Sequence, residues 1–190
     1  MEALNECVKS GKVRYLGCSA LFPYQLLKAN MIAREKGWAE FISIQNHYNL
    51  IYREEEREMM QLLEEEKMVM TPYSALAAGR LCRLPNEETE RYKDDPNSDF
   101  KYAHCKDMDA PIIKRVKEIA DKMKISMSLV ALVWVYTKPL VVSPVLGFTK
   151  LSHLEEAVKV FNIKFSEEDI KYLEELYVPH KTVGALSKPK

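Results

Sequence analysis

The sequence predicts an α/β protein in which short buried strands alternate with amphipathic helices. Four short apolar runs, at residues 13–18, 41–45, 69–73 and 141–146, have the nearly continuous hydrophobicity of strands in a parallel sheet covered on both faces. Longer stretches lie between them, and residues 110–123 carry apolar side chains at three- and four-residue spacing, as amphipathic helices do. This alternation is typical of consecutive βα units.

The expected helices follow from the same periodicity and from capping residues. We expect helices at residues 23–36, 53–67, 110–123 and 126–137. Ser152 is followed three positions later by Glu155, and Ser166 by Asp169, which is the spacing of a capping box. The last two helices are therefore expected to begin at these two serines.

Composition narrows the class of protein. The 190 residues are 47% hydrophobic, and 28 basic residues balance 28 acidic ones, so the formal net charge is zero. No long block of one sign marks a nucleic-acid or lipid surface. The longest apolar run, residues 129–136, is far below the roughly 20 residues of a membrane span, and the first residues lack a signal-peptide core. We expect a cytoplasmic protein with free thiols, without nucleic-acid or membrane partners.

One segment differs from the βα pattern. Residues 85–109 carry two prolines and many charges without a sustained apolar period, so we expect a long loop after the third strand, either a functional lid or a disordered insertion. Residues 179–190 form a C-terminal tail. His104 and Cys105 have no further ligands at useful spacing, so we predict no metal site.

Four motifs resemble, in order, the last four strand-and-loop signatures of aldo-keto reductases. They are SGKVRYLGCSA (10–20), FISIQNHYNLIYREEERE (41–58), TPYSALAAGRL (71–81) and SPVLGFTKLSHLEEAVKV (143–160), and LEELYVPHKTVG (173–184) resembles the end of the branch with broad aldehyde and ketone reductases. The resemblance implies a (β/α)8 TIM barrel, which takes about 250 residues. Residues 1–178 would then be its C-terminal half, about the last four βα units.

The resemblance also implies a nicotinamide cofactor at the carboxyl ends of the strands. Ser19 and Gln45 would hold the carboxamide, although a glutamine bonded only to backbone in a β-to-α turn is the alternative for Gln45. Tyr73 would stack on the nicotinamide ring. The alternative is a core tyrosine whose hydroxyl reaches water.

Two loops would hold the phosphates. Backbone amides and small side chains after the third strand would approach the pyrophosphate, through Ser74, Leu76, Ala78 and Gly79. Arg80 would add positive charge there, or would be an ordinary solvated arginine.

The fourth motif implies that the cofactor is NADP. Gly147 leads into the segment where Thr149 and Lys150 would contact the 2′-phosphate at a helix start, and Glu156 would hold the adenine amino group. Lys150 has an ordinary exposed lysine as its alternative. His153 replaces a larger side chain that is common in the family.

Two positions depart from the family pattern. Ala20 follows Ser19 where the family commonly has asparagine, and Ala157 replaces a second asparagine. Each lost hydrogen bond costs about 1 kcal/mol. We therefore expect the chain to bind the cofactor with reduced affinity.

The resemblance implies no catalytic residue in this chain. In the family a tyrosine tuned by lysine, aspartate and histidine protonates the carbonyl, and all four belong to the first four strands. His47 and Tyr48 match a segment without that duty. We expect an NADP(H)-dependent reductase of small aldehydes and ketones that needs the other half and is inactive alone. Alternatives are a non-catalytic nucleotide- or partner-binding module, or one piece of a split barrel. Open sheet edges would favour self-association.

Overall fold

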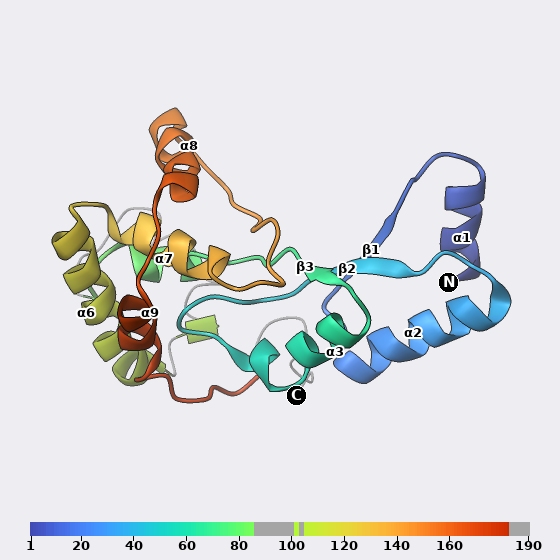
Figure 1. Cartoon of the computed structure of the whole chain (residues 1–190), viewed down its shortest axis with the longest axis horizontal. Helices are drawn as coiled ribbons and strands as arrows, with labels where there is room; N and C mark the ends of the chain where they lie inside the picture. The colour runs from blue at the N-terminus through green and yellow to red at the C-terminus, as the bar shows by residue number, and fades with distance from the viewer. Residues whose placement is uncertain (86–100, 103–104, 183–190) are drawn as a thin grey trace.

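The computed structural model describes residues 1–85, 101–102 and 105–182 (Figure 1). Among the described residues, strands alternate with helices up to β3, and the elements after β3 are all helical. The elements are α1 (Glu2–Lys9), β1 (Leu16–Ser19), α2 (Pro23–Lys36), β2 (Phe41–Gln45), η1 (Glu54–Arg57), α3 (Met59–Glu65), β3 (Val69–Met70), η2 (Ala77–Cys82), α6 (Lys106–Met123), α7 (Met127–Tyr136), α8 (Leu151–Ala157), η4 (Val158–Asn162) and α9 (Glu167–Glu174).

The three strands form one parallel sheet in the order β1-β2-β3, which confirms the predicted α/β class. The register sets Ser19 of β1 beside Gln45 of β2. Gly17 permits a close approach to β2, because a Cβ there would lie 2.7 Å from the Ser43 hydroxyl oxygen. Figure 1 shows α1 and α2 at one end of the sheet and α6 to α9 at the other.

The prediction of a fourth strand at residues 141–146 is wrong, because the segment forms no continuous strand. Its pairing with the β3 side is nevertheless parallel, as predicted. Val141 and Val145 each make a single parallel bridge, to Met70 and Tyr73 respectively. Pro144 lies between them and has no N–H to donate, so a regular ladder cannot run through this segment. The expected third strand, 69–73, ends at Met70 for the same reason, because Pro72 follows.

Three other expected boundaries need correction. The first strand begins at Leu16 instead of residue 13, and the side chain of Tyr15 is exposed. The expected helix 53–67 is split into η1 and α3 at Glu58, whose φ of −148° and ψ of −44° are not helical. Helix α6 begins at Lys106, inside the expected loop 85–109, of which residues 86–100 and 103–104 lie outside the described part.

The predicted caps are confirmed at one serine and wrong at the other. The Ser166 hydroxyl accepts the N–H of Asp169 at 3.1 Å and caps α9. By contrast, α8 begins at Leu151, and Lys150 is its N-cap without a side-chain hydrogen bond. Ser152 lies inside the helix, so its spacing to Glu155 forms no capping box.

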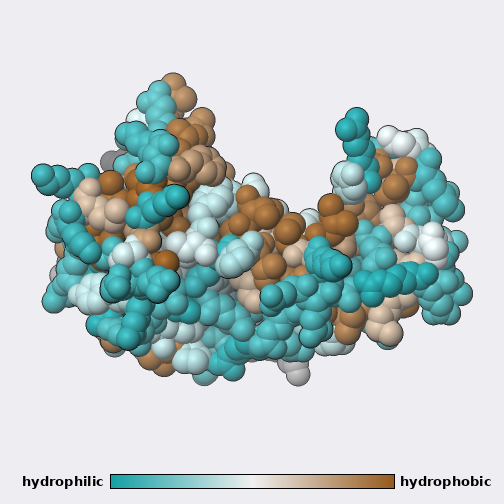
Figure 2. Space-filling model, viewed as in Figure 1, coloured by the Kyte–Doolittle hydropathy of each residue, from teal (hydrophilic) through white to brown (hydrophobic). Residues whose placement is uncertain are grey.

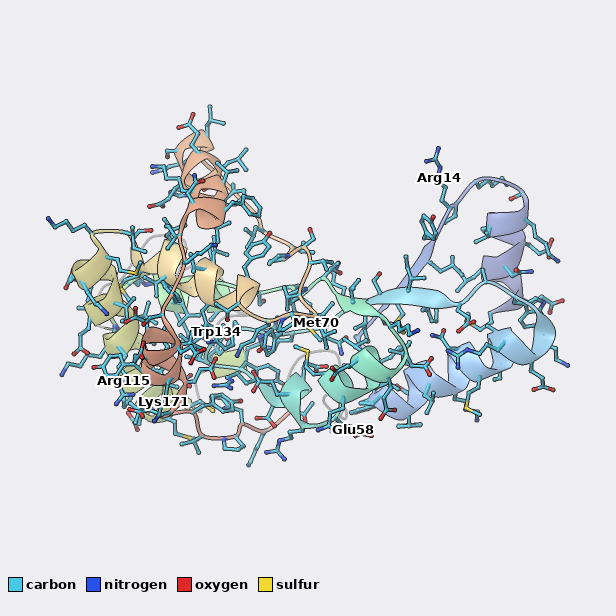
Figure 3. The ribbon with its side chains drawn as sticks, in the orientation of Figure 1. Arg14, Glu58, Met70, Arg115, Trp134 and Lys171 are labelled. Atoms are coloured by element: carbon cyan, nitrogen blue, oxygen red, sulfur yellow. The ribbon has the colours of Figure 1, made fainter. Side chains whose placement is uncertain are left out.

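The core lies between the sheet and α7, the most apolar helix. Met70 of β3 and Trp134 of α7 are fully buried and lie in the interior of Figure 3. Arg115 of α6 and Lys171 of α9 lie near each other where those two helices pack. Among the described residues, no helix is both long and apolar enough to cross a membrane.

The molecule also exposes apolar side chains. Figure 2 shows a broad hollow between the projecting α8 and the α1 region, with hydrophobic residues on its floor. On α8 and η4 the exposed apolar side chains recur at spacings of three and four residues, as Leu151, Leu154, Val158 and Phe161. Ala157 and Val160 of the same segment are buried where it packs on α7, and the exposed Phe161 ring also meets the Tyr136 ring of α7 edge-on at 5.4 Å. We call the four exposed side chains the α8 stripe.

Candidate functional site

The carboxyl ends of β1 and β2 are joined by a side-chain bond. The Ser19 hydroxyl donates a 2.6 Å hydrogen bond to the carbonyl of Gln45, its register partner. The Gln45 side chain is half-buried at this edge. Tyr73 lies at the same edge, because its backbone bridges to His47, two residues beyond Gln45. The structure therefore brings Ser19, Gln45 and Tyr73 together, as the sequence predicts.

A buried polar network beneath Ala20 was not foreseen. The backbone N–H of Ala20, in the left-handed region with φ of 55°, donates to Asn46 Oδ1 at 2.9 Å. Asn46 Nδ2 in turn donates to Glu55 Oε2 at 2.8 Å. Burial raises the pKa of Glu55 to about 7, although the bond from Asn46 acts in the opposite direction. The network fixes the strand end where Ala20 replaces the family's asparagine.

The Tyr73 ring belongs to a series of stacked aromatic rings. It stacks on His47 with centroids 5.4 Å apart, and His47 stacks on Tyr52 at 4.1 Å. The one sequence signal for this arrangement is the run of polar residues after the second strand, which interrupts the apolar pattern. The sequence interpretation assigned His47 no role.

His47 is a neutral base inside this cluster. Burial, with smaller effects from the charges of Lys101 and His180, lowers the pKa of His47 to about 3. Its Nε2 lies 2.6 Å from the hydroxyl of Tyr102, which also accepts a bond from Asn49 Nδ2 at 3.0 Å. Which of the two groups donates depends on the tautomer of the imidazole, and His47 Nδ1 is buried without a hydrogen-bond partner among the described residues. Buried and neutral, His47 is placed to support Tyr73.

The loop after β3 is compact and uses left-handed backbone. Ser74, Ala78 and Gly79 have φ of 59°, 53° and 84°. The loop's own carbonyls accept three of its amides: Ala77 donates to Ser74 at 2.8 Å, and Gly79 and Leu81 donate to Leu76 at 2.9 and 3.4 Å.

Arg80 follows in the same turn. Its guanidinium lies 5.6 Å from the ring centroid of Tyr102. Of the expected pyrophosphate residues, Ala78, Gly79 and Arg80 lie in η2, whereas Leu76 is its N-cap and Ser74 precedes it, and three amides of this turn already have backbone partners.

The fourth motif lies at the other side of α7. Gly147, Thr149 and Lys150 are exposed and lead into α8. Glu156 is half-buried, and its carboxylate accepts the Ser128 hydroxyl at 3.4 Å. Both η2 and α8 pack on α7, so the two expected phosphate segments border the same helix.

No group of three or more His, Cys, Asp or Glu side chains placed to hold a metal occurs among residues 1–85, 101–102 and 105–182. His104 lies outside the described residues.

Comparison with known proteins gives a consistent result. The family model described as the aldo/keto reductase family matches residues 1–178. An aldo-keto reductase of Fusarium vanettenii is 42% identical over 186 residues, covering 97% of this chain and 50% of that protein. Versiconal hemiacetal acetate reductase of Aspergillus parasiticus is 40% identical over 181 residues, covering 94% and 52%.

A solved structure agrees. A thermostable aldo-keto reductase in complex with the inhibitor epalrestat superposes with a TM-score of 0.65 and 26% identity, over 92% of this chain and 53% of that one. The chain spans about half the length of the curated relatives it matches. The family resemblance is confirmed, and the chain belongs to the aldo/keto reductase family.

Proposed function

We propose that this chain is the cofactor-holding part of an NADP(H)-dependent reductase of small aldehydes and ketones, folded as the last four βα units of a (β/α)8 barrel. The observation that carries this proposal is the position of Tyr73. Its backbone bridges to His47, two residues beyond Gln45 at the carboxyl edge of the sheet, and its ring is supported by His47. Ligands of parallel α/β folds bind at that edge.

The bound cofactor would supply the hydride, and the residues of this chain would position it. Gln45 and Ser19 offer an amide and a hydroxyl at adjoining strand ends, where a carboxamide can be held. The flat ring of Tyr73 would orient the nicotinamide. The turn η2 with Arg80 would face the pyrophosphate, and Thr149 and Lys150 would face the 2′-phosphate.

The proton donor and the substrate pocket would come from four preceding βα units. The reductases matched above are about twice as long as this chain. The buried, neutral His47 offers no replacement acid. We therefore propose that residues 1–190 bind the cofactor in the cytoplasm but do not reduce carbonyls alone.

A second candidate is a non-catalytic module or split-barrel piece that pairs with a second copy. In the described part of the chain, β1 pairs only with β2, and the 141–145 segment only with the β3 side. Unpaired parallel edges template association. The exposed α8 stripe adds apolar surface that such pairing would bury.

Titration of the purified chain with NADP and NAD tests the proposed function. We expect tighter binding of NADP, and loss of that preference in Lys150→Ala, because the exposed ammonium would pair with the 2′-phosphate. Lys164→Ala removes another exposed lysine and is the matched control. Equal affinity for both nucleotides in the wild type, unchanged by Lys150→Ala, would contradict the assignment.

A further inference from the structure

His180 is a buried histidine in the segment that follows α9. Its side chain is 2% exposed, and its Nε2 lies 2.8 Å from Asp109 Oδ1 on α6. Its Nδ1 lies 2.6 Å from the Val178 carbonyl, and its backbone N–H donates to Glu54 Oε1 at 2.7 Å. Residues 177–182, which we call the C-terminal strap, are thereby fixed to α6 and η1.

Both ring nitrogens of His180 face oxygen atoms, the Val178 carbonyl at Nδ1 and a carboxyl oxygen of Asp109 at Nε2. When Asp109 is ionised, both oxygens can only accept. A neutral imidazole has a single N–H, so only the imidazolium satisfies both contacts. Burial alone lowers the pKa of His180, but the hydrogen bond and charge of Asp109 outweigh it and hold that pKa above its ordinary value.

Among the described residues, Glu54, His47 and Tyr177 also lie near this ring. Glu54 on η1 adds negative charge, and its second oxygen pairs with Arg57 at 2.6 Å. His47, beyond β2, is neutral down to about pH 3. Tyr177 stacks on the imidazole with centroids 5.4 Å apart. The Asp109 carboxylate is therefore the partner that sets the charge of His180.

A continuous series of ring contacts leads from His180 to Tyr73. The Tyr52 ring meets His180 edge-on at 6.3 Å and stacks on His47 at 4.1 Å. His47 in turn stacks on Tyr73 at 5.4 Å. Chains of packed side chains are one of the ways in which energetic coupling is carried between two sites.

We propose that His180, held as an imidazolium between Asp109 and Val178, is a positioning residue that fixes the Tyr73 ring through Tyr52 and His47. The inference rests on the proposed function for its consequence at the cofactor, but its structural step does not. Loss of the His180 proton leaves one ring nitrogen with a lone pair against an oxygen lone pair. The strap then loosens, the stack beneath Tyr73 loses its outer support, and cofactor affinity falls as pH rises.

The structural step is tested without any ligand. In protein with isotope-labelled histidine and tyrosine rings, NMR follows His180 and Tyr73 between roughly pH 6.5 and 9.5, above the ordinary histidine pKa. We expect the Tyr73 ring signals to shift with the same midpoint as His180. In Asp109→Asn the shared midpoint should move to lower pH, because the stabilising charge is gone. Asp121→Asn, an exposed carboxylate on the same helix, should leave it unchanged.

The functional step is tested by NADP titration over the same pH range. We expect affinity to fall about tenfold across the His180 midpoint, within the roughly 5- to 150-fold range of coupling between sites. In His180→Gln, which cannot titrate, the affinity should be low and show no such step. The cofactor phosphate titrates equally in both experiments, so the ratio of the wild-type affinity to the His180→Gln affinity at each pH removes its effect.

The outcomes separate the two proposals. The positioning role is overturned if the Tyr73 ring signals do not shift as His180 titrates, or if the midpoint does not move in Asp109→Asn. Either result counts against it even if NADP binds well. Coupled NMR titrations with no NADP binding at any pH support the positioning role and contradict the proposed function instead.

Discussion

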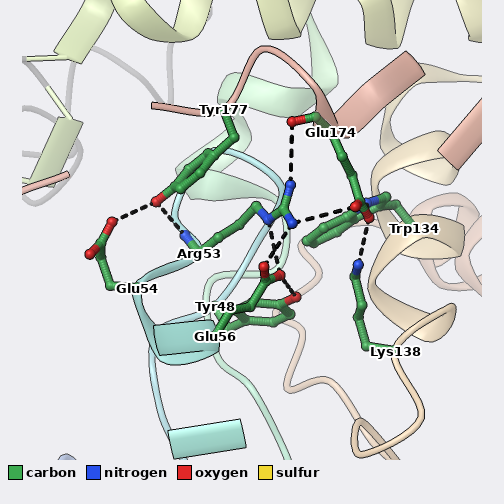
Figure 4. Close-up of polar contacts among 8 residues, drawn as sticks. All are labelled: Tyr48, Arg53, Glu54, Glu56, Trp134, Lys138, Glu174 and Tyr177. Atoms are coloured by element: carbon green, nitrogen blue, oxygen red, sulfur yellow. Dashed lines mark hydrogen bonds and ion pairs between the residues drawn. The ribbon is translucent and has the colours of Figure 1, made fainter. Parts of the chain in front are cut away.

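The backbone N–H of Arg53 donates a 2.8 Å hydrogen bond to the hydroxyl of Tyr177, 124 positions later in the chain. The same hydroxyl donates to Glu54 Oε1 at 2.8 Å, so it serves as acceptor and donor at once (Figure 4). The Arg53 side chain pairs with Glu56 at 2.7 Å and with Glu174 at 3.4 Å. Residues after β2 are thereby joined to α9 and the C-terminal strap.

Replacing Tyr177 by phenylalanine should destabilise the fold. The ring contacts are kept, but the Arg53 amide and the Glu54 carboxylate each lose a partner in a half-buried site. We expect the free energy of unfolding to fall by about 1–3 kcal/mol. Chemical denaturation measures it. Tyr24→Phe, whose ring is exposed, is the control and should change stability little.

Glu174 should be the most sensitive acidic residue of α9. Its carboxylate accepts the indole N–H of Trp134 at 2.8 Å and pairs with Lys138 and Arg53. Glu174→Ala leaves these donors without their acceptor, so we expect the free energy of unfolding to fall by about 2–4 kcal/mol, somewhat less than the roughly 3–5 kcal/mol for fully buried pairs. Denaturation of Glu174→Ala beside Glu64→Ala, an exposed glutamate, checks this. Equal stabilities would refute the assignment.

Glu55 should make stability depend on pH near neutrality. Burial raises its pKa from 4.5 to about 7 in the folded protein. A raised pKa means that the folded state binds the proton more tightly, so this stabilisation is complete below about pH 4.5 and lost as pH rises through about 7. The difference is on the order of 3 kcal/mol.

Comparison of wild type with Glu55→Gln isolates that contribution. Glutamine keeps an oxygen for the Asn46 amide but cannot ionise. Unfolding free energies measured at acidic and alkaline pH should show a smaller decrease in the variant. A decrease of the same size in both proteins would mean that Glu55 does not titrate as described.

The isolated chain should not turn over carbonyl substrates. General acid catalysis supplies about 10²- to 10⁴-fold, and a positioned substrate adds roughly 7–11 kcal/mol, and we assign both to preceding βα units. NADPH oxidation with a panel of reactive aldehydes should match the rate of the free cofactor. Turnover that co-purifies with the chain and disappears in Tyr73→Ala would show that this chain carries its own proton donor.

Self-association should depend on the α8 stripe. The monomer mass is 22.0 kDa, and light scattering after size-exclusion chromatography should report a larger species. Phe161→Lys places a charge in the stripe and should shift the population toward monomer, since burying an unpaired ammonium is costly. Tyr24→Lys, at another exposed ring, is the control. A wild-type chain that is monomeric at high concentration would contradict this expectation.

The sequence by itself determined the alternation of strands and helices and the family. Buried parallel strands and helix faces depend on local hydrophobic periodicity, which residues 41–45 and 110–123 carry plainly. The Ser166 cap is equally local, since it needs only a hydroxyl and an amide three residues apart. Motifs in a fixed order were enough to place Gln45 and Tyr73 at one edge.

Tertiary structure decided what depends on partners distant in the chain. Residues 141–146 have a strand's composition, but Pro144 and the limited pairing beside β3 allow only single bridges. His47 became a neutral support because burial among Tyr52, Tyr73 and Tyr102 lowers its pKa, and the pKa of His180 is raised because Asp109 lies 71 positions away in the chain yet within 2.8 Å. Periodicity cannot reveal such contacts, because a side chain's protonation state depends on burial and neighbouring charge that only the folded chain brings together.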